Sequence, residues 1–211
     1  TPSNSSAASD VYKRQLLGDS NDLLMQIKSE IMSEFRRPLI LLFIDPFGKF
    51  STQIKLPILH NFVDGWSVDL IINIMSSFLA RGFSSAAKNI KQFRDRVGEL
   101  FGNLCEDENA QELQICMCYE GRQEKISPKD ILDVYYFFLK KIGYVFIDSI
   151  SVQYKNQALY HMIFASKAKG AKEWMRNYIE YLRSKTPEEY EILKNLWLQA
   201  SGRQLSIMDL F

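Results

Sequence analysis

The feature of the sequence that most limits the fold is an unbroken apolar run that ends abruptly in a proline and a glycine. Residues 39–44 read LILLFI, and DPFG follows at 45–48. An apolar run without alternation predicts a strand buried on both faces, as in a parallel sheet covered by helices. Proline cannot donate to the strand ladder, so the strand must end here. Asp45 is therefore expected at the carboxyl end of a central strand, where open α/β sheets bind ligands.

The composition indicates a single globular domain whose nearly balanced charges create no strong electrostatic field. A chain of 211 residues that is 46% hydrophobic can bury a substantial core. Its 26 basic and 25 acidic residues nearly cancel, so charge favours neither nucleic acid nor an anionic membrane. No apolar run reaches the roughly 18 residues that a membrane span needs, and no signal peptide is evident. Cys105, Cys116 and Cys118 fit neither a disulfide framework nor a metal motif, which predicts a cytoplasmic protein without a metal site.

The first residues differ from the rest of the chain. Residues 1–15 are polar and share no periodicity with the segments after them, which predicts a disordered or artefactual tail. The stretch SSAASDVYKRQ, Ser5 to Gln15, resembles the translation of a sequencing-library adapter. We therefore expect a metagenomic fragment whose upstream part is missing and whose first 15 residues do not belong to the fold.

From residue 16 onward the chain alternates between helical and strand patterns. Helices are expected from a cap at Ser20 or Asn21 to about Arg36, around 53–62, over 84–102, and from the cap at Ser127 to Gly143. Strands are expected at 39–44, 68–75, and in a hairpin at 144–154 and 158–167, while 103–126 stays open between strand and helix. We assign residues 16–184 to one α/β domain, 185–201 to a C-terminal helix and 202–211 to a tail.

The order strand, helix, strand, helix and closing antiparallel hairpin resembles the second half of a Rossmann-like class I methyltransferase. Three sequence segments resemble the three-Cys-motif partner (TcmP) family, over roughly residues 38–180. They are FIDPFG at 43–48, DLIINIM at 69–75 with Arg81 following, and LYHMIFASK at 159–167. This family is methyltransferase-like and prokaryotic or phage-borne. The resemblance implies S-adenosylmethionine as the cofactor and a three-Cys-motif protein as the partner.

One departure from such enzymes stands out. They hold S-adenosylmethionine with a glycine-rich turn after their first strand, and no G-x-G occurs in this sequence. We therefore expect the fragment to lack the half of the domain that binds the donor and to be inactive by itself. The open edge left beside residues 39–44 predicts self-association through this strand.

The resemblance assigns roles to the DPFG residues, which stand where amino-group methyltransferases carry Asp/Asn-Pro-Pro-aromatic. Asp45 and the Pro46 carbonyl would accept hydrogen bonds from a target amine, and Phe47 would stack on the substrate. Phe47 and Gly48 depart from that motif, so the substrate class does not transfer. The alternative is that Asp45 and Pro46 only end a strand and start a turn.

Other candidates are weaker. Asn73, at the end of the next strand, could line the same cleft or simply tie down a loop. Arg81 could bind an anionic substrate or form a surface ion pair. His60 and His161 have no partners at metal or triad spacing, so we interpret both as structural.

Two functions remain open at this stage. One is an S-adenosylmethionine-dependent methyltransferase acting on a base, an amine or a protein side chain. The other is a non-catalytic, methyltransferase-like binding module that acts with its three-Cys-motif partner. A nuclease would need clustered carboxylates, and Asp45 stands alone at its strand end.

The last ten residues, GRQLSIMDLF, suggest a peptide motif. Their sequence loosely resembles the peptides that dock in the hydrophobic pocket of replication sliding clamps. The motif would use Gln204, Ile207, Leu210 and Phe211. A clamp-binding tail would make DNA the expected substrate, and the alternative is a tail that folds back on its own domain.

Overall fold

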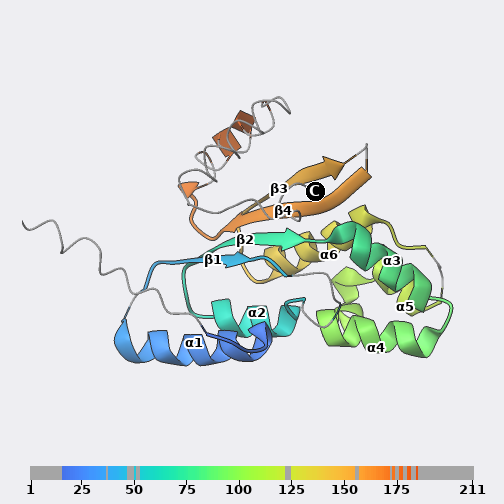
Figure 1. Cartoon of the computed structure of the whole chain (residues 1–211), viewed down its shortest axis with the longest axis horizontal. Coiled ribbons are helices and arrows are strands. Elements are labelled where there is room, and N and C mark those ends of the chain that lie inside the picture. Colours follow the sequence, from blue (N-terminus) through green and yellow to red (C-terminus); the bar gives the residue numbers. More distant parts are fainter. Residues whose placement is uncertain are drawn as a thin grey trace, which may run out of the picture.

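The computed structural model describes residues 16–36, 38–46, 50, 53–121, 125–154 and 157–171, with a few residues between 173 and 184. These residues form an α/β fold of helices and one mixed sheet (Figure 1). The elements in chain order are α1 (Ser20–Glu34), β1 (Ile40–Ile44), α2 (Leu56–Val63), β2 (Val68–Ile74), α3 (Ser76–Ala86), α4 (Ile90–Phe101), α5 (Gln114–Tyr119), α6 (Pro128–Lys141), β3 (Phe146–Tyr154) and β4 (Gln157–Ser166). The predicted α/β class is confirmed.

The strands lie in the order β1-β2-β4-β3. β1 and β2 are parallel, and β4 runs antiparallel to both of its neighbours. β1 therefore occupies one edge of the sheet and β3 the other (Figure 1). The register pairs Ile44 with Ile72, so the residues that follow β1 lie level with the last residues of β2.

The two faces of the sheet are covered differently. Leu70, Ile72 and Ile163 belong to the main core with the side chains of the helices. On the opposite face Phe146 and Phe164 form a small separate cluster. Within the described part of the chain, helices thus cover mainly one face.

This asymmetry corrects the prediction for residues 39–44. Successive side chains of a strand point to opposite faces. Ile44 faces the helices and is 6% exposed, whereas Leu41 and Phe43 are 67% and 55% exposed. The prediction of burial on both faces is wrong in the described structure, because only one face of β1 meets a helical layer.

Several helix boundaries follow their predicted signals. Ser127 and Asp130 form a reciprocal capping box at the start of α6, with Pro128 in its first turn. Gly143 follows α6 with a φ of 91°, a left-handed conformation that glycine adopts at little cost. At α1 the cap is Asp19, which accepts from the Asn21 amide, instead of the predicted Ser20 or Asn21.

The helix predicted over residues 84–102 is in fact two helices. Its first residues belong to α3, which begins at Ser76, and Asn89 caps the separate helix α4 by accepting from the Gln92 amide. The region 103–126, for which the sequence did not distinguish strand from helix, contains 3-10 turns at Leu104–Glu106 and Glu108–Ala110 and then α5. The expected C-terminal helix and the tail lie outside the described residues, as do residues 1–15. None of the described helices is both long and apolar enough to cross a membrane.

The structure contains a disulfide that the sequence analysis did not predict. Cys105 and Cys116, separated by 11 positions, are joined, and the buried Cys118 lies outside this pair. The turn at Leu104–Glu106 and helix α5 bring the two sulfur atoms together, a proximity that the spacing of the cysteines does not reveal.

This disulfide makes the stability of the protein sensitive to reductant. Closing a loop of this length contributes about 2–3 kcal/mol in the chain-entropy description, which corresponds to a fall of about 5–10 °C in Tm on reduction. Thermal unfolding followed by circular dichroism with and without dithiothreitol measures the difference. Cys105→Ser should abolish the reductant effect and Cys118→Ala should keep it. An identical wild-type Tm in both buffers would contradict the pairing.

Candidate functional site

The carboxyl ends of β1 and β2 bring two of the predicted site residues together. The Asn73 side-chain amide donates a hydrogen bond of 2.6 Å to Asp45 Oδ1. Because β1 and β2 are parallel and in register, Asp45 directly follows β1 at the level of Asn73. The Asp45 side chain is exposed, so its second carboxylate oxygen is open to a donor from outside the sheet.

Asn73 has one polar atom that is not satisfied. Its Oδ1 is buried, and no donor among the described residues bonds to it. A buried acceptor without a partner costs roughly 1–3 kcal/mol, so such atoms call for an explanation. The hydrogen bond from Nδ2 to the Asp45 carboxylate fixes the orientation of the amide, because the reverse orientation would set two oxygens against each other. The strand ends therefore hold a buried amide oxygen next to an exposed carboxylate, and only the carboxylate of Asp45 is open to a ligand.

The other predicted site residues are not gathered at this point. Pro46 follows Asp45 and is half-buried, while Phe47 and Gly48 lie outside the described residues. Arg81 is exposed on α3, and no hydrogen bond or ion pair among the described residues joins it to Asp45 or Asn73. The candidates in the tail, Gln204, Ile207, Leu210 and Phe211, also lie outside the described residues.

Sequence reasoning missed the residue that anchors the chain shortly after β1. The Phe50 ring packs edge-on against Phe83 at 5.0 Å between centroids, and the Arg96 guanidinium lies 5.1 Å from its centroid. Arg96 also donates to the Gly82 carbonyl at 2.6 Å. An aromatic residue just after the DPFG sequence was the available signal. Phe50 therefore attaches the chain that leaves β1 to helices α3 and α4.

His161 has a partner, but on the other face of the sheet. Its Nδ1 lies 2.7 Å from Ser76 Oγ at the start of α3. Burial lowers the pKa of His161, which favours the neutral imidazole that one hydrogen bond to a hydroxyl can satisfy. Ser76 is 0% exposed and His161 is half-buried, so the hydroxyl of this pair does not face solvent. The structural interpretation of His161 therefore fits this environment, although its partner is 85 positions away.

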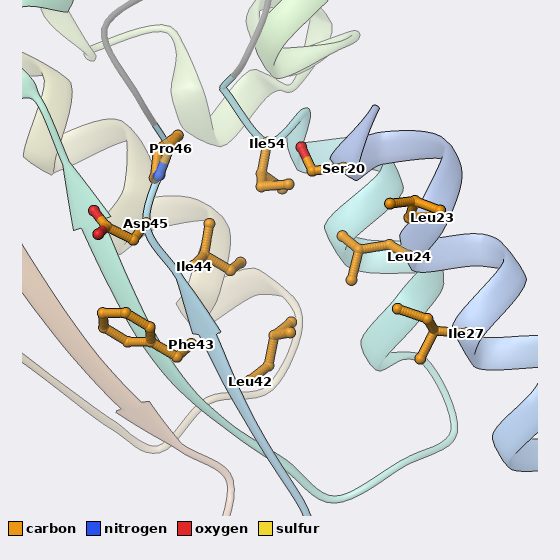
Figure 2. A pocket seen from close by; sticks show the side chains of 10 residues that line it. All are labelled: Ser20, Leu23, Leu24, Ile27, Leu42, Phe43, Ile44, Asp45, Pro46 and Ile54. Carbon is orange, nitrogen blue, oxygen red and sulfur yellow. The ribbon is translucent and has the colours of Figure 1, made fainter. Parts of the chain in front are cut away.

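A groove of about 240 Å³ separates α1 from β1. Figure 2 shows Leu24 and Ile27 of α1 facing Leu42 and Ile44 of β1 across it, while Phe43 and Asp45 point to the other side of the strand. Most of its lining is apolar, and it is smaller than the roughly 300–1,000 Å³ typical of pockets for small molecules. No group of three or more potential ligands in the described part of the chain could hold a metal ion.

Comparison with known proteins adds no assignment. No protein-family model matches this chain, and no curated protein or solved structure is significantly similar to it.

The contact between Phe50 and α3 can be tested with two glycines. Gly82→Ala should lower the free energy of unfolding by roughly 1–3 kcal/mol through overpacking, because its methyl group would lie 2.7 Å from the Phe50 ring. Gly98 lies in α4 with nothing within 4 Å of an added Cβ, so Gly98→Ala should raise the stability by about 0.5–1 kcal/mol. Urea denaturation of both variants measures the contrast. Equal stability of Gly82→Ala and wild type would mean that Phe50 is not seated against α3.

Proposed function

We propose that this chain is the C-terminal part of a methyltransferase-like α/β domain of the three-Cys-motif partner family. The strand order supports this, because the antiparallel hairpin of β3 and β4 completes the sheet beside the parallel pair β1 and β2, as the resemblance implies. The hydrogen-bonded pair of Asp45 and Asn73 at the ends of β1 and β2 lies where open α/β sheets bind ligands. The observation that carries the proposal is the hydrogen bond from Asn73 to Asp45 beside an unsatisfied acceptor.

In this proposal the site binds and orients the amine group of the substrate. The exposed oxygen of Asp45 and the Pro46 carbonyl would accept its N–H groups and orient its lone pair. Asn73 is a positioning residue, because its amide occupies Oδ1 of Asp45 and leaves the other oxygen for the substrate. Such catalysis depends on orientation, in which small displacements cost much of the rate. Phe47 would supply the stacking face.

The described residues do not form a site for S-adenosylmethionine by themselves. The groove at β1 is too small and too apolar for a charged nucleoside sulfonium, and the glycine-rich turn that would hold it does not occur in the sequence. The proposed role of this chain is therefore to present the acceptor, while the donor contacts belong to other polypeptide. The alternative of a non-catalytic module with a three-Cys-motif partner uses the same residues without methyl transfer.

A donor-binding and transfer experiment tests the proposal. Calorimetry of this chain with S-adenosylmethionine should show no saturable binding at micromolar concentration. In a longer protein that includes this sequence and a glycine-rich turn, Asp45→Ala should reduce transfer of a radiolabelled methyl group roughly 100-fold or more, with donor affinity retained. Asn73→Ala should give a smaller loss.

Asp95→Asn, at an exposed position of α4, is the matched control and should transfer methyl groups at the wild-type rate. Unchanged turnover in Asp45→Ala would overturn the role of Asp45. The longer wild-type protein could instead bind the donor but transfer no methyl group to nucleic-acid, amine or protein acceptors. This result would favour the non-catalytic module.

The proposal that the tail binds a sliding clamp rests on sequence alone. A synthetic peptide spanning residues 202–211 should bind a bacterial clamp, and replacing both Leu210 and Phe211 by alanine should abolish binding because these are the apolar anchors. Fluorescence anisotropy measures both peptides. No binding of the unaltered peptide at several hundred micromolar ends the idea, and binding would make DNA the first acceptor to test.

A further inference from the structure

Exposed apolar side chains are concentrated in one stretch of the sequence, which contains α1 and β1. Ten large hydrophobic side chains are exposed among the described residues, and seven of them lie between positions 17 and 43. These seven are Leu17, Met25, Met32, Phe35, Leu39, Leu41 and Phe43. They belong to α1, to β1 and to the segments beside them, which form one end of the layered structure (Figure 1). Leu39, Leu41 and Phe43 stand at every second position and so share one face of the extended chain at β1, and an exposed apolar face of this kind commonly marks a binding surface.

The backbone of β1 is also available at this edge. Within the described strands β1 pairs with β2 alone, so the opposite side of β1 presents a row of unpaired amides and carbonyls. Natural edge strands are commonly protected by lysine, proline or a bulge. None of these protects Ile40–Ile44, which is apolar throughout and in regular register with β2. β1 is therefore a template for one more strand.

The groove beside β1 provides space for the side chains of such a strand. It lies between Leu24 and Ile27 of α1 and Leu42 and Ile44 of β1 (Figure 2). On the other face the exposed Leu41 and Phe43 would meet the outward side chains of the added strand. The strand that fits must therefore be apolar on both faces, as β1 itself is.

The charges at the two ends of β1 indicate the direction of the added strand. Arg36 precedes the strand and Asp45 follows it. If a second β1 ran parallel, like charges would meet at both ends, whereas an antiparallel copy would bring each Arg36 toward the other Asp45. Opposite charges across strands stabilise a pair and like charges destabilise it.

We propose that a second copy of this chain docks at this edge, with its β1 antiparallel to the first. The two sheets then join across a two-fold axis through their β1 strands, and each copy uses the same surface, as in most homodimers. In a register that continues the sheet, Leu41 and Phe43 of both copies fall on one face and cover each other. This association does not depend on the proposed methyl transfer.

Light scattering coupled to size exclusion tests the proposal on the complete 211-residue chain. The wild-type chain should be a dimer at tens of micromolar and should dissociate on dilution. Leu41→Lys should be a folded monomer by circular dichroism, because it places like charges close to the two-fold axis on an already exposed position. Ile90→Lys is the matched control, since Ile90 is an exposed apolar residue on α4, and it should remain a dimer.

Charge reversal tests the antiparallel direction separately. Arg36→Glu and Asp45→Lys should each weaken the dimer, and the double variant should restore it, because opposite charges meet again. A wild-type monomer at tens of micromolar would overturn the proposal and mean that other polypeptide covers β1. Larger aggregates that Leu41→Lys does not dissolve would overturn it as well, as would loss of the dimer in Ile90→Lys.

Discussion

The sheet depends on the backbone hydrogen bonds that β4 makes on both of its sides. β4 runs antiparallel between β2 and β3, so each of these strands is held by the same central element. One side of β2 is then occupied by β4, and the other side remains for β1 in parallel orientation. Parallel neighbours end at the same edge of the sheet, which is why Asp45 and Asn73 meet although 28 positions separate them. The candidate site follows directly from this topology.

Much of the fold could be predicted because its signals are local. The apolar runs at 39–44 and 68–75 contain β1 and β2, and the strands predicted at 144–154 and 158–167 agree with β3 and β4 to within two residues at each end. Both ends of α6 follow from the capping residues at its start and the glycine after its end. In each case the residue that determines the structure is a near neighbour of the residues whose conformation it fixes.

What the sequence could not supply were contacts between distant segments. The exposure of Leu41 and Phe43 depends on which elements cover the second face of the sheet, and an apolar run does not carry this information. The partner of His161 is Ser76, and the ring of Phe50 lies over Gly82, so neither contact shows in local spacing. That Asp45 and Asn73 lie close together could be predicted, because each stands at the carboxyl end of one of two parallel strands.

The proposed amine site and the proposed dimer interface both use the carboxylate of Asp45. One of its carboxylate oxygens accepts from Asn73, which leaves the other for a single strong partner. An amine substrate and the Arg36 guanidinium of a second copy both need this oxygen. If both proposals hold, the dimer and the amine-bound form exclude each other at this atom. Two sites that bind competitively are coupled, so the dimer would weaken amine binding and an amine would weaken the dimer by the same factor.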